Sequence, residues 1–89
     1  AGNLQSVAVG YQATALGFKS LAIGANASAN SFGVAIGDNA RALGPRSTVI
    51  GESSTANGED ALVFGANNLA TGNGALTIGA RAVSNGTNA

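Results

Sequence analysis

Several residue types on which enzymes and metalloproteins depend are missing from this chain of 89 residues. It has no cysteine, histidine, methionine or tryptophan, and only 9% of its residues are charged. The absence of cysteine and histidine excludes disulfides and removes both the commonest general base and the soft metal ligands. Four basic and four acidic residues provide no basic surface of the kind that binds nucleic acid. No apolar run approaches the length of a membrane-spanning helix. We therefore expect no enzymatic activity, no cofactor, no metal, no nucleic acid and no direct membrane contact by this segment.

Glycine, in contrast, is abundant, with 14 copies, and six of these end the same short phrase. The phrase has the form x-apolar-small-apolar-Gly, as in Ser20-Leu21-Ala22-Ile23-Gly24. Its final glycines are Gly10, Gly24, Gly37, Gly51, Gly65 and Gly79, at intervals of 14, 13, 14, 14 and 14 residues. A repeat at a fixed period indicates a stack of similar units, each of which buries its apolar face on its neighbours. We therefore treat residues 1–89 as a single repeat domain.

Each unit is predicted to contain two short strands, because its apolar residues alternate with a period of two. The first strand lies in the glycine phrase, and the second follows it, as in Asn26-Ala27-Ser28-Ala29. Glycine at both corners is expected to supply the positive φ angles of tight bends. Six coils stacked as parallel strands about 4.8 Å apart form a rod roughly 29 Å long. The second coil is one residue short, and we place the deletion in the turn near Phe32. The prediction is an all-β fold, a β-solenoid of about six 14-residue coils.

Residues at equivalent positions of the six coils form columns along the rod. Two columns of large residues from the first strands are predicted to fill the coil core: Val7, Leu21, Val34, Leu62 and Leu76 (with Thr48 as a polar exception), and Val9, Ile23, Ile36, Ile50, Phe64 and Ile78. Two columns of small residues from the second strands are predicted to face them: Ala13, Ala27, Ala40, Ser54, Asn68 and Ala82, and Ala15, Ala29, Ala42, Ala56, Ala70 and Ser84. The amide of Asn68 requires hydrogen bonds to be tolerated at such a position.

The remaining column of the first strands carries no charge although it is predicted to face outward. It consists of Ala8, Ala22, Ala35, Val49, Val63 and Thr77. A strand that is apolar on both faces is normally covered on both sides, and this chain has no further segment to cover it. We therefore predict an obligate homo-oligomer in which this column is the interface near the rotation axis.

The phrase S-[VL]-A-[VI]-G, followed one strand later by A-x-A-x-G, resembles the head repeats of trimeric autotransporter adhesins, the YadA-like family. The resemblance extends from Ser6 to Gly86. It implies a left-handed parallel β-roll, three intertwined chains and display on the surface of a Gram-negative bacterium. It also implies an outer-membrane anchor in segments outside this chain, and adhesion to host extracellular matrix or cells. The resemblance assigns no particular exposed residue to the host ligand.

Two other functions are compatible with a β-solenoid of this kind. In the first, the segment is a spacer that projects another adhesive domain. In the second, it is an ice-binding solenoid with a flat outward row of threonines. The best column for such a row reads Thr14, Ser28, Arg41, Thr55, Leu69 and Val83, and its later members interrupt the threonine pattern. Arg46 and Asp60 occupy the same turn position in successive coils, which predicts a surface ion pair. Phe18 and Phe32 are expected to cover coil junctions or a neighbouring chain.

Overall fold

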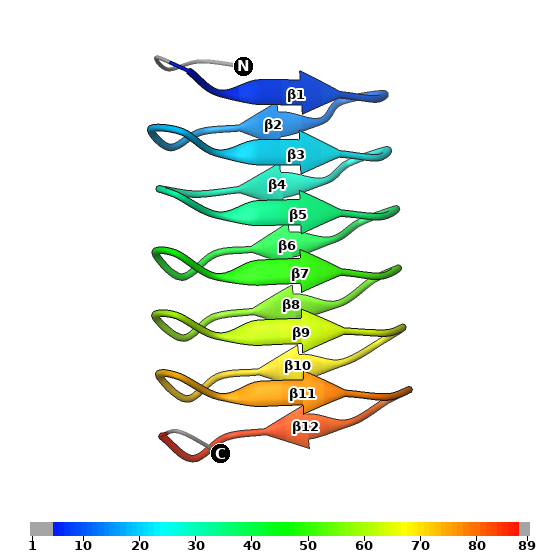
Figure 1. Cartoon of the computed structure of the whole chain (residues 1–89). Coiled ribbons are helices and arrows are strands. Elements are labelled where there is room, and N and C mark those ends of the chain that lie inside the picture. The colour runs from blue at the N-terminus through cyan, green and yellow to red at the C-terminus, as the bar shows by residue number, and fades with distance from the viewer. Residues whose placement is uncertain (1–4, 88–89) are drawn as a thin grey trace.

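The computed structural model describes residues 5–87, and within them the chain is a roll of twelve short strands with no helix (Figure 1). The chain alternates between two six-stranded parallel sheets. Sheet A contains β1 (Val7–Val9), β3 (Leu21–Ile23), β5 (Val34–Ile36), β7 (Thr48–Ile50), β9 (Leu62–Phe64) and β11 (Leu76–Ile78). Sheet B contains β2 (Thr14–Ala15), β4 (Ser28–Ala29), β6 (Arg41–Ala42), β8 (Thr55–Ala56), β10 (Leu69–Ala70) and β12 (Val83–Ser84). The predicted β-solenoid of about six coils is confirmed.

Neighbouring coils pair in the register that the repeat predicts. In sheet A, Ala22 pairs with Ala8 on one side and Ala35 on the other. In sheet B, Ala29 lies between Ala15 and Ala42 in the same way. Parallel backbone hydrogen bonds also run between turns, so that each coil rests on the next along its whole length. The Cα atoms of the resulting rod span 31 × 20 × 11 Å.

Two rows of turns form the edges of the roll. The leading turns come before the strands of sheet A, on the left of Figure 1, and the trailing turns come after them, on the right. The deletion in the second coil lies in a leading turn, as predicted: Leu16 and Leu43 are each followed by glycine, whereas Asn30 is followed directly by Ser31. The Asn30 side chain donates a hydrogen bond of 2.8 Å to the carbonyl of Leu43, which ties the shortened turn to the next coil.

Glycine has different roles at the two edges. In the trailing turns the phrase glycine has a positive φ angle, for example 144° at Gly51, as predicted. In the leading turns the prediction is wrong, because there a polar or aromatic residue such as Lys19 or Phe32 is usually the one with positive φ. The leading-turn glycine is required by space instead. A Cβ atom on Gly44 would overlap the backbone of Gly58 in the next coil.

The core of the roll consists of small residues from both sheets. The predicted inner columns of sheet B are confirmed, since Ala15, Ala29 and Ala42 are completely buried. The two predicted faces of sheet A are wrong, because they are exchanged. Val49 and Val63 have no exposed surface even in the single chain, whereas Val9 and Ile78 are 54% and 64% exposed.

This exchange corrects both sets of assigned residues. The column assigned to the trimer interface lies inside the coil: Ala22, Ala35, Val49, Val63 and Thr77 are buried there, and Ala8 packs against them. The residues assigned to the coil core lie on the outer face of sheet A, exposed or half-buried: Val7, Val9, Leu21, Ile23, Val34, Ile36, Ile50, Leu62, Phe64, Leu76 and Ile78.

The thinness of the roll explains which face turns inward. Tight turns join the sheets at both edges, and the whole fold is only 11 Å thick at the level of its Cα atoms. That thickness includes both sheets with their pleats, so the space between them is limited to small inward side chains. Alanine opposite alanine fills this space, with serine or alanine such as Ser47 and Ala61 beside the turns. Inward isoleucine in every coil would force the sheets apart.

Asn68 and Ser54 are buried polar residues whose side chains are hydrogen-bonded, as predicted for Asn68. The Asn68 side-chain nitrogen donates to the carbonyls of Phe64 and Gly79 at 2.8 and 2.6 Å, and its oxygen accepts from the backbone N–H of Ala82 at 2.8 Å. Ser54 donates to the carbonyl of Gly65 at 2.6 Å and accepts from the backbone N–H of Asn68. Asn68 thereby links the turns of two successive coils.

Thr77 is the exception among the buried polar side chains of residues 5–87, because its hydroxyl has no hydrogen-bond partner. We expect Thr77→Val to raise the free energy of unfolding by about 1 kcal/mol, because an unbonded buried hydroxyl is replaced by a methyl group of similar size. Chemical denaturation measures the change. Thr14→Val, on the exposed face of sheet B, is the control and should have a much smaller effect. A decrease in stability for Thr77→Val would show that its hydroxyl is bonded in solution.

Candidate assembly interface

The outer face of sheet A carries more than half of the exposed large hydrophobic residues of the described roll. Two outward columns cross its six strands, and neither contains a charged residue. Val7, Val9, Ile50, Leu76 and Ile78 are exposed large hydrophobic residues on this face. The half-buried residues between them make the apolar surface continuous from β1 to β11. A contiguous apolar face of this size is typical of a surface that is covered by another protein chain.

The outer face of sheet B differs, because its strands present hydroxyl and charged groups to solvent. Thr14 and Arg41 are exposed on it, and Ser28 and Thr55 are half-buried. Leu69 and Val83 in the last two coils are its apolar members. One face of the roll is thus suited to burial and the other to water. That another chain covers one face of sheet A stays a prediction. The face concerned, however, is the one with the large side chains and not the one with the small side chains.

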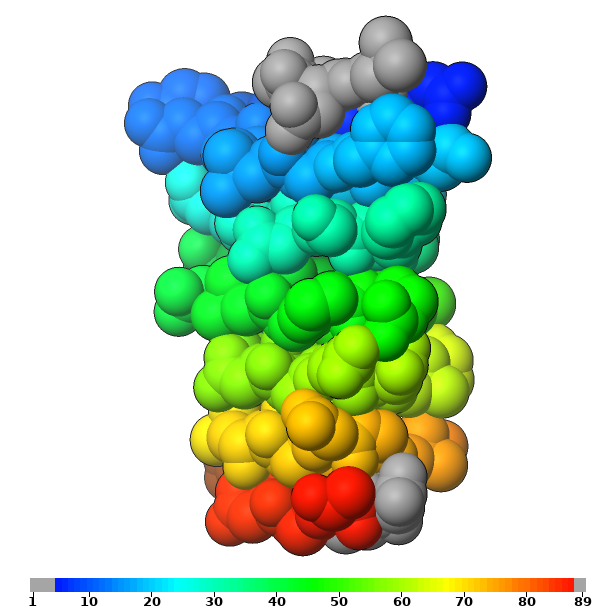
Figure 2. Space-filling view, turned by 90° about the vertical axis from the view of Figure 1, so that its left-hand side faces the viewer, coloured from blue at the N-terminus to red at the C-terminus, as the bar shows by residue number. Residues whose placement is uncertain are grey.

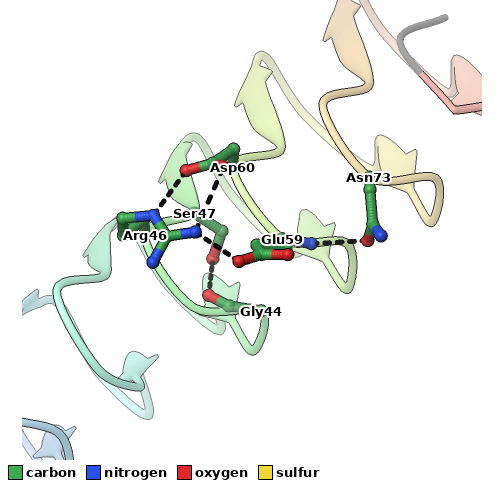
Figure 3. Close-up of polar contacts among 6 residues, drawn as sticks. All are labelled: Gly44, Arg46, Ser47, Glu59, Asp60 and Asn73. Atoms are coloured by element: carbon green, nitrogen blue, oxygen red, sulfur yellow. Dashed lines mark hydrogen bonds and ion pairs between the residues drawn. The ribbon is translucent and has the colours of Figure 1, made fainter.

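A cluster of charged residues occupies the leading turns of the middle coils (Figure 3). The Arg46 guanidinium donates to Asp60 at 2.8 Å and also bonds Glu59, so the predicted Arg46–Asp60 pair is confirmed. The hydrogen bond from Arg46 lowers the pKa of the Asp60 carboxyl below its ordinary value. Asn73 in the following coil accepts from the backbone N–H of Glu59 at 2.9 Å. The cluster connects three successive turns, and its ends are open to solvent.

The same geometry predicts a small dependence of stability on pH. Because the folded pKa of Asp60 is depressed, the pair with Arg46 contributes stability above the ordinary pKa of 3.8, and this contribution is lost as the pH falls through the lower folded value. We expect Asp60→Asn to lower the melting temperature slightly at pH 7 and to lower it less at pH 3, where part of this contribution is already lost. The effect is small because the pair is exposed and screened by solvent. Melting curves at both pH values test this, and an equal loss at both would contradict the role of the charge.

An aromatic pair lies in the leading turns of the first coils. The rings of Phe18 and Phe32 meet edge to face with centroids 5.8 Å apart at an angle of 79°. The ammonium of Lys19 lies 5.4 Å from the centroid of the Phe18 ring. The leading turns form the edge that faces the viewer in Figure 2. Sequence analysis singles out both phenylalanines but does not predict their mutual contact, because the rings meet only when the two coils stack.

Sequence reasoning missed the apolar outer face of sheet A, although a signal for it is present. The signal is that the inner positions of sheet B are almost all alanine. If the small residues of sheet A face them, every coil has the same small thickness. The choice between the two faces of sheet A depends on size matching across the coil, which hydrophobic alternation does not provide.

The chemistry available within the described part of the chain is limited. Residues 5–87 contain no pocket and no group of three residues that could hold a metal ion. No helix in that range is long and apolar enough to cross a membrane. The features that remain are therefore surfaces: the apolar outer face of sheet A, the polar outer face of sheet B, and the two edges.

Comparison with known protein families agrees with the geometry of the roll. The YadA head domain repeat matches residues 1–27, 15–31, 32–54 and 42–68, which together cover more than half of the chain. No curated protein matches the chain. The fold and the family match define a β-solenoid head, and the chain belongs to the YadA head family of trimeric autotransporter adhesins.

Proposed function

We propose that the chain is the head of a homotrimeric bacterial surface adhesin, in which the outer face of sheet A from each copy packs around a common axis. The observation that carries the proposal is the continuous apolar outer face of sheet A in a member of this family. Family membership supports three copies wound as left-handed rolls. Burial of the face removes the large side chains from water, which the thin alanine core of a single roll does not do.

The dimensions of the roll support three copies. Three faces, each about 20 Å wide, close into a triangular prism whose sides lie about 6 Å from the axis. This distance is close to half the ~10 Å spacing between packed sheets, so valine and isoleucine side chains fill the centre. Four such faces would lie about 10 Å from the axis and leave the centre open.

In this arrangement the outer faces of the three copies of sheet B point away from the axis. The adhesin presents three identical surfaces on one rigid rod, and multivalent contact raises avidity even where each contact is weak. We propose that these surfaces bind host extracellular matrix or cell-surface proteins, of which collagen, fibronectin and laminin are the classes that the family suggests. The segment acts by binding and display, without catalysis or a cofactor. Anchoring in the bacterial outer membrane would depend on other segments.

Replacement of this segment in the parent protein tests adhesion directly. A neutral rod of equal length is substituted for the head, and attachment of the bacteria to immobilised matrix proteins is measured. Loss of attachment at unchanged surface density supports binding by the head. Attachment that persists would favour the alternative function, in which the roll is a spacer that projects another adhesive domain.

A further inference from the structure

We infer that Phe18 and Phe32 form a contact between neighbouring copies, in which the aromatic pair of one copy packs against the trailing ends of β1 and β3 of the next. The inference rests on the proposed homotrimer and adds to it a specific contact between edges. The partner surface is a second copy of this chain.

The first observation is that two large rings are held together at the surface. Phe18 is 40% exposed and Phe32 is 49% exposed, and their edge-to-face contact fixes each ring relative to the other. Leu16 in the same turn as Phe18 is also exposed, so the apolar patch continues beyond the two rings. Exposed aromatic clusters are typical of the central contacts of protein interfaces.

The second observation concerns the backbone of Phe32. Its φ angle is 57°, in the left-handed region that bulky residues rarely adopt. Equivalent positions in other coils carry Lys19, Arg46 and Asp60, which are charged and exposed. Coil two therefore holds an aromatic residue in an unfavourable conformation where a polar residue is usual. The same φ angle recurs in the turns of the other coils and belongs to the fold, so the particular feature of coil two is the large apolar side chain, which contact with another chain would cover.

The symmetry of the trimer determines which surface of the neighbouring copy lies opposite the aromatic pair. When identical rolls surround an axis parallel to the rod, the leading edge of each copy meets the trailing edge of the next at the same height. Phe18 lies between β1 and β3 along the rod, and these strands end at Val9 and Ile23. Both side chains are exposed in the single chain, Val9 by 54% and Ile23 by 36%. The ends of β1 and β3 thus offer an exposed apolar surface to the aromatic pair of the next copy.

Cross-linking between introduced cysteines tests this contact, and the chain has no cysteine of its own. We expect the double variant Phe18→Cys/Ile23→Cys to give covalent dimers and trimers on a denaturing gel after treatment with a short bismaleimide. The control is Phe18→Cys/Ile78→Cys, which places the second thiol at the far end of the same column. It should give no covalent oligomers. Cross-linking that is equal in both variants, or absent from both, overturns the inference.

Removal of the rings provides a second, energetic test. Phe18→Ser/Phe32→Ser is expected to raise the concentration at which trimers dissociate about tenfold or more, as loss of an aromatic contact at an interface does. The control Val83→Ser removes an equally exposed apolar side chain from the outer face of sheet B and should leave dissociation unchanged.

The outcomes separate this contact from the proposed trimer. An unmodified chain that trimerises but shows no selective cross-linking overturns the edge contact alone. A double serine variant with unchanged dissociation and reduced binding to matrix proteins also overturns it, because the rings would then contact the host ligand. An unmodified chain that is monomeric overturns the trimer, and this contact with it. If the serine variant fails to fold, the cross-linking result decides.

Discussion

Replacement of Ala22 by leucine is expected to destroy the packing of the second coil. Ala22 is completely buried between sheets A and B, in a roll whose Cα thickness is 11 Å. Three additional carbon atoms have no space there unless the sheets separate, and the turns at both edges oppose separation. We expect the free energy of unfolding to fall by about 3 kcal/mol or more, the upper part of the range for overpacked cores. The melting temperature followed by circular dichroism measures the loss.

The neighbouring residue provides a matched control. Ile23→Leu changes the shape of a side chain on the outer face of sheet A without increasing its volume, and should cost less than about 1.5 kcal/mol. If Ala22→Leu were tolerated and Ile23→Leu were not, the isoleucine would face the interior of the coil. That result would contradict the assignment of faces given above.

Introduction of a carboxylate at Ile23 is expected to break the assembly. In the proposed trimer the side chain is covered by the neighbouring copy, so Ile23→Glu would place a carboxylate away from water at each of the three contacts between copies. We expect the dissociation constant to rise at least a hundredfold, which corresponds to about 2.7 kcal/mol. Sedimentation equilibrium over a dilution series measures the shift.

The pH dependence of this variant gives a second measure. Burial raises the pKa of the introduced carboxyl groups in the trimer, so protonation favours assembly. Association should therefore recover as the pH is lowered toward 4 to 5. The control is Thr14→Glu, on the exposed face of sheet B, which should remain assembled at all pH values. Unchanged assembly of Ile23→Glu at pH 7 would show that the outer face of sheet A is not the interface.

The sequence predicts the architecture well because the repeat determines it. The spacing of the six phrase glycines predicts the number of coils, their parallel register and the position of the shortened turn, and all three are confirmed. The inner columns of sheet B are predicted correctly because alanine alternates there with polar residues. The bonds of Asn68 also follow from its position, since a buried amide requires partners on adjacent coils.

The exchange of faces in sheet A has a physical reason. Both faces of these strands are apolar, so alternation separates Ala22 from Ile23 but does not show which one turns inward. The deciding quantity is the distance between the sheets, which depends on turns whose geometry the sequence shows only in part. The residue with positive φ in the leading turns, for example Lys19 or Phe32, has no common residue type across the coils. The aromatic pair was similarly hidden, because it depends on how two coils superimpose.

The central claim is that three copies of the chain bury the outer face of sheet A around one axis. Sedimentation equilibrium of the unmodified chain, with circular dichroism on the same samples, tests it most directly. The account predicts a β-rich species with three times the chain mass of 8.5 kDa, maintained over a wide range of dilution. A folded, β-rich monomer at every concentration would contradict it, because the apolar face would then remain in water without a partner.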